Sequence, residues 1–387
     1  MKILYCIPSL YNAGGMERVI SEKANYFADL PNYDISIVTT DQQGKAIRFP
    51  LDKRIRLIHL NIDFNAHFTA NLFKQYILHN RKLRVYKKQL SKLIKEIGID
   101  ICISLCGKEI EFIDKMDVQC KKIAELHFSM NYRKQFLTSR HTEFWWKILG
   151  DIRVHQFKKA VRGLDKLIVL TKNDRLQWEQ THLNILQIPN PNPLQNDTIS
   201  TLEAKRVISV GRLDAQKGYD MLVDTWALVN SRHPDWVLDI FGEGEWELML
   251  TNRINKLNLT EKIKLCGLTS DVMANYLESS IYVMSSRYEG FAMVLIEAMS
   301  CGLPVVSFNC ECGPSEIITN GVNGFLIAPN NIQQLAHKIC LLIENEAIRK
   351  QMGIEANKSV NQYLKETVML QWVELFDCIL QQPQKTS

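Results

Sequence analysis

The sequence lacks several features that would place it quickly in a class of protein. No run of about 18 apolar residues occurs in its 387 positions, so no transmembrane helix is expected. Its ten cysteines form no Cys-x-x-Cys pair and sit mostly in apolar runs, a usage typical of a reducing compartment. The one close pair, Cys310 and Cys312, has no second cluster and makes a poor zinc site. The apolar stretch after Met1 is too short for a secretory signal, so we expect a cytoplasmic protein.

Signatures of common nucleotide and metal sites are missing as well. No Asp-x-Asp pair occurs, which removes the usual carboxylate pair for a divalent metal on a diphosphate. The P-loop order of Gly-Lys-Ser/Thr and the three-glycine dinucleotide fingerprint are also absent. A diphosphate would therefore have to be held by cationic side chains and helix N-termini, without a metal.

Charge is distributed unevenly between the two halves of the chain. Residues 1–190 carry 31 Lys and Arg against 19 Asp and Glu, a balance of +12, whereas the remainder carries 16 against 23, a balance of −7. A basic half would suit a nucleic-acid binder, but aromatic residues are not interleaved with the basic run as in base-stacking motifs. We expect no nucleic-acid partner.

Short apolar runs alternate with helical patterns along the whole chain. Such alternation is typical of parallel, doubly wound sheets, and 387 residues favour two domains. The predicted strands are 3–7, 35–39, 55–60, 101–105, 122–126 and 167–170, followed by 206–210, 237–241, 263–265, 281–284 and 305–308. The predicted helices are 16–29, 71–97, 219–231, 245–257, 273–278, 293–300 and a region from 332 onward. The Pro-rich stretch 188–193 can continue neither a helix nor a central strand, so it is the predicted linker.

The predicted fold class is therefore α/β, with two tandem Rossmann-like domains. Each domain has a doubly wound parallel sheet, and the two domains face a central cleft. Ligands of such sheets bind at the carboxyl ends of the strands.

The segment 287–299 is the most informative in the chain. We interpret Glu289 as a loop residue and Glu297 as lying inside a helix that begins near Ala292. Exposed N–H groups between the two carboxylates would then form an anion site. A diphosphate there would place a sugar and a ribose beside carboxylates that can bind their hydroxyls. The alternative is an amphipathic core helix with two solvated Glu side chains.

Two loops that follow predicted strands carry further candidates. Arg212 and Lys217 lie five apart after strand 206–210, where both can neutralise a diphosphate, although an ordinary basic surface loop has the same pattern. Gly14 and Gly15 follow the first strand and open a helix, so their backbone can approach a phosphate closely. A plain strand-to-helix turn is the alternative there.

Two more positions follow predicted strands. Gly242, after strand 237–241, favours a tight turn beside a nucleoside. His127, after strand 122–126, can bind a sugar hydroxyl or assist a proton as a neutral imidazole. A packed His without a chemical role would occupy the same position.

Together these motifs resemble the retaining glycosyltransferases of family 4, which have two Rossmann-like domains in the arrangement called GT-B. The matching stretches are Gly14-Gly15-Met16-Glu17-Arg18, Gly211-Arg212-Leu213 with Lys217-Gly218, Gly242-Glu243-Gly244, Tyr288-Glu289-Gly290-Phe291 with Glu297-Ala298, and Gly302-Leu303-Pro304-Val305-Val306. Stretches 312–318 and 321–326 look like the branch that builds bacterial surface polysaccharides. The resemblance covers essentially the whole chain.

The resemblance implies a retaining, metal-independent transfer of a hexosyl or hexosaminyl unit from a UDP-sugar, or another nucleotide sugar, to a glycan or lipid-linked saccharide. It implies an acceptor-binding domain at 1–190 and a donor-binding domain at 191–365, with a last helix at about 366–381 that returns to the first domain. The residues that it assigns to catalysis are Glu289, His127, Arg212 and Lys217. Those that it assigns to the donor are Gly14, Gly15, Arg212, Lys217, Gly242, Leu268, Glu289, Gly290, Phe291, Ala292, Met293, Val294 and Glu297. No cofactor is expected.

The chain departs from the family pattern at two places. Ala292 replaces a Gly that often follows the Phe, and Asn309 with Glu311 stand where Asp and Pro are frequent. Ala is harmless at 292 if that residue has ordinary helical angles, so the site is expected to be intact.

The basic tract 71–97 needs its own explanation. Its Lys and Arg side chains accompany Tyr76, Ile77 and other apolar residues, so it can rest on an anionic inner membrane or form a solvated face over a buried stripe. The adjacent Trp145 and Trp146 can anchor at such an interface or fill the core. Function classes left open are a non-catalytic glycan-binding or nucleotide-sugar-binding protein of the same fold, a sugar-nucleotide epimerase and a phosphorylase.

Overall fold

A computed structural model describes residues 1–12, 14–64, 72–132, 134–135, 144–181, 184–194 and 198–381. Ala13, Asn71 and the polar tail after Gln381, which the sequence analysis mentions, lie outside these residues. The chain divides into two compact units. The first consists of residues 1–130, 151–191 and 366–387, and the second of 131–150 and 192–365. In the described residues no helix is long and apolar enough to cross a membrane.

The first unit is built on a sheet of seven parallel strands in the order β3-β2-β1-β4-β5-β6-β7. The strands are β1 (Lys2–Ile7), β2 (Asp34–Thr39), β3 (Arg56–His59), β4 (Ile101–Ser104), β5 (Lys121–Leu126), β6 (Lys166–Val169) and β7 (Ile185–Gln187). The helices between them are α1 (Gly15–Asp29), α2 (Leu72–Ile97), α4 (Phe144–Val161) and α5 (Lys172–Glu179). Two buried clusters of side chains pack against the sheet.

The second unit repeats this arrangement with six parallel strands in the order β10-β9-β8-β11-β12-β13. The strands are β8 (Arg206–Val210), β9 (Val237–Phe241), β10 (Ile263–Leu265), β11 (Ile281–Met284), β12 (Val305–Phe308) and β13 (Gly324–Ile327). The helices are α6 (Tyr219–Asn230), α7 (Glu247–Lys256), α8 (Val272–Leu277), α9 (Met293–Ser300), α10 (Pro314–Ile317), α11 (Ile332–Glu344) and α12 (Glu346–Ser359). Both sheets have the strand order of a doubly wound fold, so the predicted fold class is confirmed.

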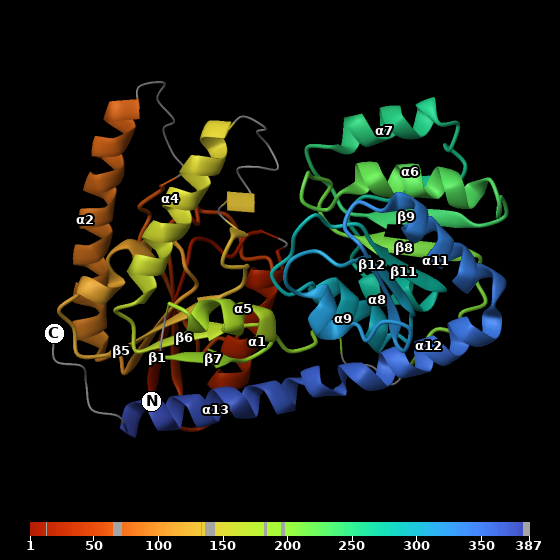
Figure 1. The fold of residues 1–387 in the computed structure, drawn as a ribbon. Helices are drawn as coiled ribbons and strands as arrows, with labels where there is room; N and C mark the ends of the chain where they lie inside the picture. The colour runs from red at the N-terminus through yellow and green to blue at the C-terminus, as the bar shows by residue number, and fades with distance from the viewer. Residues whose placement is uncertain are drawn as a thin grey trace. The chain divides into compact units, whose positions relative to one another are not determined.

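The last helix, α13 (Lys365–Gln381), belongs to the first unit although it follows the second in sequence (Figure 1). Its inner face buries Val368, Trp372 and Phe376 in the cluster that also contains Tyr5 and Phe27. The rings of Phe27 and Phe376 lie 5.2 Å apart. Burial of such side chains stabilises a helix through packing more than through its own propensity.

A buried ion pair lies beneath this helix. Lys23 Nζ of α1 donates to both carboxylate oxygens of Glu125 on β5 at 2.8 Å, and both side chains are inaccessible to solvent. The ammonium also lies 3.3 Å from the centre of the Trp372 ring. Burial lowers the pKa of Lys23 to about 8. Burial acts to raise the pKa of Glu125, but its contacts with Lys23 and His127 outweigh this and lower it to about 2.

We expect this pair to make the protein less stable in acid. The carboxyl of Glu125 has an ordinary pKa of 4.5 and a folded pKa of about 2. Because the folded pKa is depressed, the stabilisation is fully present above about pH 4.5 and is lost as the pH falls toward 2, an effect of about 3 kcal/mol. Urea unfolding of wild type and of Lys23→Met/Glu125→Gln between pH 2 and 6 measures it. The difference between the two proteins should change over this window, and a constant difference would contradict the ionised pair.

Candidate active site

The loops of interest follow the two neighbouring strands at which the strand order of the second sheet reverses. Strands β8 and β11 pair directly, and the chain continues outward on either side to β9 and β12. The carboxyl ends of strands at such a reversal form the usual binding crevice of an open α/β sheet. Residues 211–218 follow β8, and residues 285–292 follow β11.

The loop after β8 is shaped by its own side chains. Asp214 Oδ1 accepts hydrogen bonds from the backbone N–H groups of Gln216 and Lys217 at 3.0 and 3.2 Å. Gly218 has φ of +63°, and a Cβ there would lie 2.3 Å from the carbonyl oxygen of Ser285. Only glycine therefore lets this loop pack against the loop after β11. The sequence analysis missed Asp214, although an Asp two residues before the bonded N–H is the usual signal of such a turn.

The structure brings Lys217 and Glu289 together. Lys217 Nζ lies 2.7 Å from Glu289 Oε1, and the Ser286 hydroxyl donates to the same oxygen at 2.6 Å. Both Glu289 and Ser286 are buried. Arg212 instead lies 3.4 Å from Asp214, with its side chain 69% exposed. The geometry thus makes a fixed Lys–Glu pair at the strand ends and leaves the second predicted cation in solvent.

Helix α9 begins at Met293, and Ala292 is its N-cap residue. Ala292 has φ of +56° and ψ of +54°, so the expectation of ordinary helical angles at this position is wrong. The left-handed conformation brings Cβ close to the following carbonyl oxygen, which is why glycine is favoured there. Phe291 is buried against Tyr363, with ring centres 5.6 Å apart, and this packing fixes the entry to the helix. Gly290 and Val294 flank this entry.

We expect Ala292→Gly to stabilise the second unit by about 1 kcal/mol. The gain in relieved left-handed strain, roughly 1–2 kcal/mol, exceeds the added entropy of an unfolded glycine, about 0.5–1 kcal/mol. The midpoint of urea unfolding followed on the second unit measures this. Ala298→Gly, inside α9, is the matched control and should destabilise the protein. A lower midpoint for Ala292→Gly would show that the left-handed conformation at 292 is not strained.

Glu297 lies in the first turns of the same helix and is held by a neighbouring helix. The hydroxyl of Tyr276, on α8, donates to Glu297 Oε2 at 3.2 Å. Tyr276 is fully buried, and burial together with the charge of Glu297 raises its pKa well above the usual value. The phenol therefore stays protonated and acts as a hydrogen-bond donor. The sequence analysis did not single out Tyr276, because its partner lies 21 residues away on another element.

Two further predicted residues lie at the same edge of the sheet. The N–H of Gly242 donates to the carbonyl oxygen of Gly267 at 2.8 Å, and a Cβ on Gly242 would lie 1.9 Å from the carbonyl oxygen of Gly211. Gly242 therefore forms a bridge between neighbouring loops and not the tight turn that was expected. Leu268 directly follows Gly267 and is 56% exposed.

The predicted residues of the first unit follow β1 and β5. A Cβ on Gly14 would lie 2.3 Å from Glu17 Oε2, so this glycine makes room for a carboxylate of its own helix. A Cβ on Gly15 would meet nothing within 4 Å, which leaves space for a ligand there. His127 follows β5, and its Nε2 lies 3.1 Å from Glu125 Oε1. These residues form a second group at the carboxyl edge of their own sheet.

Metal ligation was also considered. In the ranges that the structure describes, no group of three or more His, Cys, Asp and Glu side chains is arranged to hold a metal ion. The cysteines that surround Glu311, Cys310 and Cys312, are both buried and free.

Comparison with known proteins gives the family. Residues 194–359 match the family model described as glycosyl transferases group 1. An uncharacterized glycosyltransferase of Haemophilus influenzae is 32% identical over 376 residues, which cover 96% of this chain and 98% of that protein. The amylovoran biosynthesis glycosyltransferase AmsD of Erwinia amylovora is 25% identical, over 97% of this chain and 99% of that protein. A structure of Staphylococcus aureus TarM, solved with fondaparinux, α-GlcNAc-glycerol and UDP, has a TM-score of 0.79, 20% identity and coverage of 97% and 99%.

The likeness to TarM shows the fold, and the Haemophilus relative matches nearly the full length of both chains. On this evidence the chain belongs to the group 1 glycosyl transferases and is a glycosyltransferase.

Proposed function

We propose that the chain transfers a hexosyl or hexosaminyl unit from a UDP-sugar to a hydroxyl of a glycan or lipid-linked saccharide. The transfer proceeds with retention at the anomeric carbon, without a metal, at the cytoplasmic face of a bacterial inner membrane. The product belongs to a surface polysaccharide. The biosynthetic name of the Erwinia relative, and the UDP and α-GlcNAc-glycerol bound by TarM, support this proposal.

One observation carries the proposal. Glu289 and Glu297 lie on either side of the start of α9, and Lys217 reaches the first of them at 2.7 Å. A helix N-terminus binds an anion through its free N–H groups, and carboxylates bind hydroxyls. This combination suits a diphosphate that carries a sugar at one end and a ribose at the other.

Each residue then has a distinct task. Glu297 binds the ribose, and the N–H groups from Phe291 to Val294 bind the diphosphate. Glu289 accepts a hydrogen bond from a hydroxyl of the donor sugar, while Lys217 neutralises the charge that develops on the leaving diphosphate. Arg212, which projects into solvent, closes on the diphosphate once it is bound. The acceptor hydroxyl attacks from the face that the diphosphate leaves, and its proton passes to the departing phosphate oxygen.

A donor screen in EDTA tests this function. Purified protein is mixed with UDP-glucose, UDP-galactose, UDP-N-acetylglucosamine, UDP-N-acetylgalactosamine or GDP-mannose, and saturation transfer and slow release of nucleotide are measured. We expect selective binding of a UDP-sugar and metal-independent release of UDP, both lost in Glu297→Ala. Conversion of the sugar without release of nucleotide would favour an epimerase. If no nucleotide sugar binds, or if the variant binds equally well, the assignment of the two carboxylates is wrong.

We expect Tyr276→Phe to weaken binding of UDP about tenfold. The lost hydroxyl leaves Glu297 without the donor at 3.2 Å that orients it, and a hydrogen bond to a charged group contributes about 1.5–3 kcal/mol. Titration calorimetry with UDP and with its 2′,3′-dideoxy analogue measures this. The variant should lose affinity for UDP only, since the analogue has no hydroxyls for Glu297 to bind. An equal loss for both ligands would mean that Tyr276 supports the fold and not the ribose contact.

The surface of α2 supports a lipid-linked acceptor. Tyr86, Leu90 and Ile94 are buried on its inner face, whereas Tyr76 and Ile77 are more than half exposed. Trp145 of α4 is 76% exposed, so it does not fill the core. Helix α2 also carries eight basic residues, namely Lys74, Arg81, Lys82, Arg84, Lys87, Lys88, Lys92 and Lys95. Exposed apolar side chains among cations are typical of a surface that rests on an anionic membrane.

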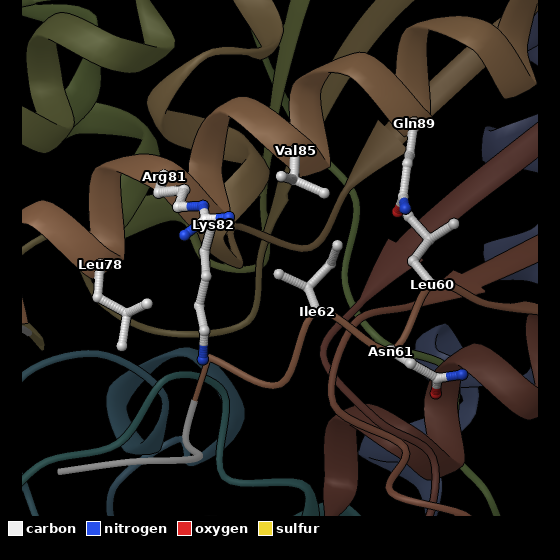
Figure 2. Close-up of a pocket in the computed structure, with 8 residues that line it drawn as sticks. All are labelled: Leu60, Asn61, Ile62, Leu78, Arg81, Lys82, Val85 and Gln89. Atoms are coloured by element: carbon white, nitrogen blue, oxygen red, sulfur yellow. The ribbon is translucent and has the colours of Figure 1, made fainter.

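A shallow groove lies between α2 and the segment that follows β3. It has a volume of about 210 Å³ and is walled by Leu60, Asn61 and Ile62 on one side and Leu78, Arg81, Lys82, Val85 and Gln89 on the other. Figure 2 shows the helix side chains facing Leu60 and Ile62. Lys82 donates to the backbone oxygen of Asp63 across the groove. Apolar walls beside a guanidinium suit the part of an acceptor where a phosphate joins a lipid.

Flotation with liposomes tests the membrane contact. Binding to vesicles of phosphatidylglycerol at low salt, weak binding to phosphatidylcholine and release at high salt are expected. Replacing Tyr76 and Ile77 by Ser should weaken binding at every salt concentration, and replacing Arg81 and Arg84 by Gln should reduce the salt dependence. Absence of binding at either salt would end the membrane proposal.

A further inference from the structure

The buried pair of Lys23 and Glu125 lies next to a residue that the proposed function uses. His127 is two residues after Glu125 on the same strand end, and its Nε2 lies 3.1 Å from the Glu125 oxygen that also accepts from Lys23. The side chain of His127 is 6% exposed, so water does not compete freely for this contact. The ring nitrogen is not aligned for a hydrogen bond in this structure, and no other protein atom pairs with it there. A small rotation of the ring would align Nε2–H with the carboxylate.

A buried carboxylate beside one ring nitrogen decides which tautomer the imidazole adopts. The proton is favoured on Nε2, where it can be donated to Glu125, and Nδ1 is left as an acceptor. An Nδ1 acceptor can receive a hydrogen bond from a sugar hydroxyl, whereas the opposite tautomer would present a donor there. The pair thus sets the hydrogen-bonding character of His127.

The carboxylate itself is held charged by elements far away in sequence. An isolated carboxylate at this depth would take up a proton, because burial penalises the ionised form. Lys23 prevents this with two contacts at 2.8 Å, and its ammonium in turn lies over the ring of Trp372 at 3.3 Å. The hydroxyl of Tyr5, on β1, is the other titratable group near the pair, and the ammonium lies 5.8 Å from its ring. Helices α1 and α13 therefore both contribute to the charge beside His127.

We propose that Glu125 is a positioning residue that fixes the tautomer of His127 for contact with the donor sugar, and that Lys23, packed on Trp372 of α13, keeps Glu125 ionised. This inference rests on the proposed function, in which His127 contacts the donor sugar. It assigns to α13 a role in tuning the site in addition to its packing.

The test uses a variant in which both charges are removed. Lys23→Met/Glu125→Gln leaves no buried charge without a partner, so the fold should be retained. The protein is labelled with ¹⁵N at its nine His residues, and the His127 signals are identified by their loss in His127→Gln. We expect wild-type His127 to be protonated at Nε2 alone and the double variant to show a mixture of tautomers.

A kinetic measurement on the same proteins tests the consequence. The rate of UDP release from the UDP-sugar that wild type hydrolyses should fall by about tenfold or more in kcat in the double variant, with a smaller change in KM, as when the orienting carboxylate of a catalytic His is lost. The matched control is Arg206→Met/Asp239→Asn, which removes a similar pair 2.6 Å apart in the second unit. It should leave both the His127 tautomer and the rate unchanged.

The outcomes are separable from those of the proposed function. If wild type releases no UDP from any sugar nucleotide, the proposed function fails, while the NMR measurement still reports on the pair. If the double variant keeps both the wild-type tautomer and the wild-type rate, Glu125 and Lys23 are structural only and the inference is overturned. An equal loss of rate in the control pair would have the same meaning.

Discussion

Replacing Lys217 by Met is expected to slow donor cleavage by about 10²–10³-fold in kcat. The ammonium is the cation that the structure fixes at the strand ends, 2.7 Å from Glu289 and mostly buried. Preorganised charges aimed at a leaving group contribute about 2.7–4 kcal/mol to transition-state stabilisation, more than the same charge in water. Because Met keeps the length of the side chain, the fold should be retained.

The expected loss lies in kcat more than in KM, since Lys217 acts on charge that develops as the bond to the diphosphate breaks. Release of UDP from the hydrolysed donor is measured over a range of donor concentrations. Lys205→Met is the matched control, because Lys205 forms an exposed pair with Asp235 at 2.6 Å and should leave the rate unaltered. A rate for Lys217→Met within threefold of wild type would show that the ammonium does not act on the leaving group. Lys217→Arg should recover part of the rate only if charge alone is sufficient.

The strands of both sheets were predictable from the sequence because most of them are short apolar runs between turn residues. Strand β11, for example, was predicted with the same bounds as observed, and β1 with a difference of one residue. Two strands at sheet edges were missed. Strand β7 has three residues, none of them fully buried, and β13 begins with Gly324, so neither carries the usual signal.

The geometry around α9 was predictable only in part. The helix was predicted at its observed bounds, because an apolar run follows a Gly-containing turn. The left-handed angles of Ala292 were not predictable, because they arise from packing with a loop 20 residues later. A Cβ on Gly313 would lie 3.4 Å from that of Ala292, and Gly313 itself has φ of +91°. Sequence patterns describe local preferences, whereas this conformation is imposed by tertiary contact.

The partners of predicted site residues were the least predictable. Tyr276 and Glu125 carry no motif, and a Lys such as Lys23 in an amphipathic helix is usually exposed. Lys23 and Glu125 are 102 residues apart, and the packing of α1 on the sheet brings them together. Their burial becomes favourable only as a pair, a property that neither residue shows alone.

Removing one member of this pair is expected to have the largest effect on stability. Glu125→Gln leaves the Lys23 ammonium buried without a counter-charge, and Lys23→Met leaves the carboxylate in the same condition. Breaking a buried ion pair in this way costs about 3–5 kcal/mol, whereas removing both charges together is often neutral or stabilising. The double variant should therefore be more stable than either single variant, a strong positive coupling.

Hydrogen exchange of amides in β5 and α1 is the suitable measurement, because the two units can unfold separately and a single midpoint would mix them. Faster exchange in both single variants and near wild-type exchange in the double variant are expected. Trp372→Leu keeps an apolar contact on α13 but removes the ring that lies 3.3 Å from Lys23. It should destabilise wild type more than it destabilises Lys23→Met, because only the former has an ammonium to lose contact with the ring. If the two losses are equal, the ring serves packing alone, and the link between α13 and the charge beside His127 is absent.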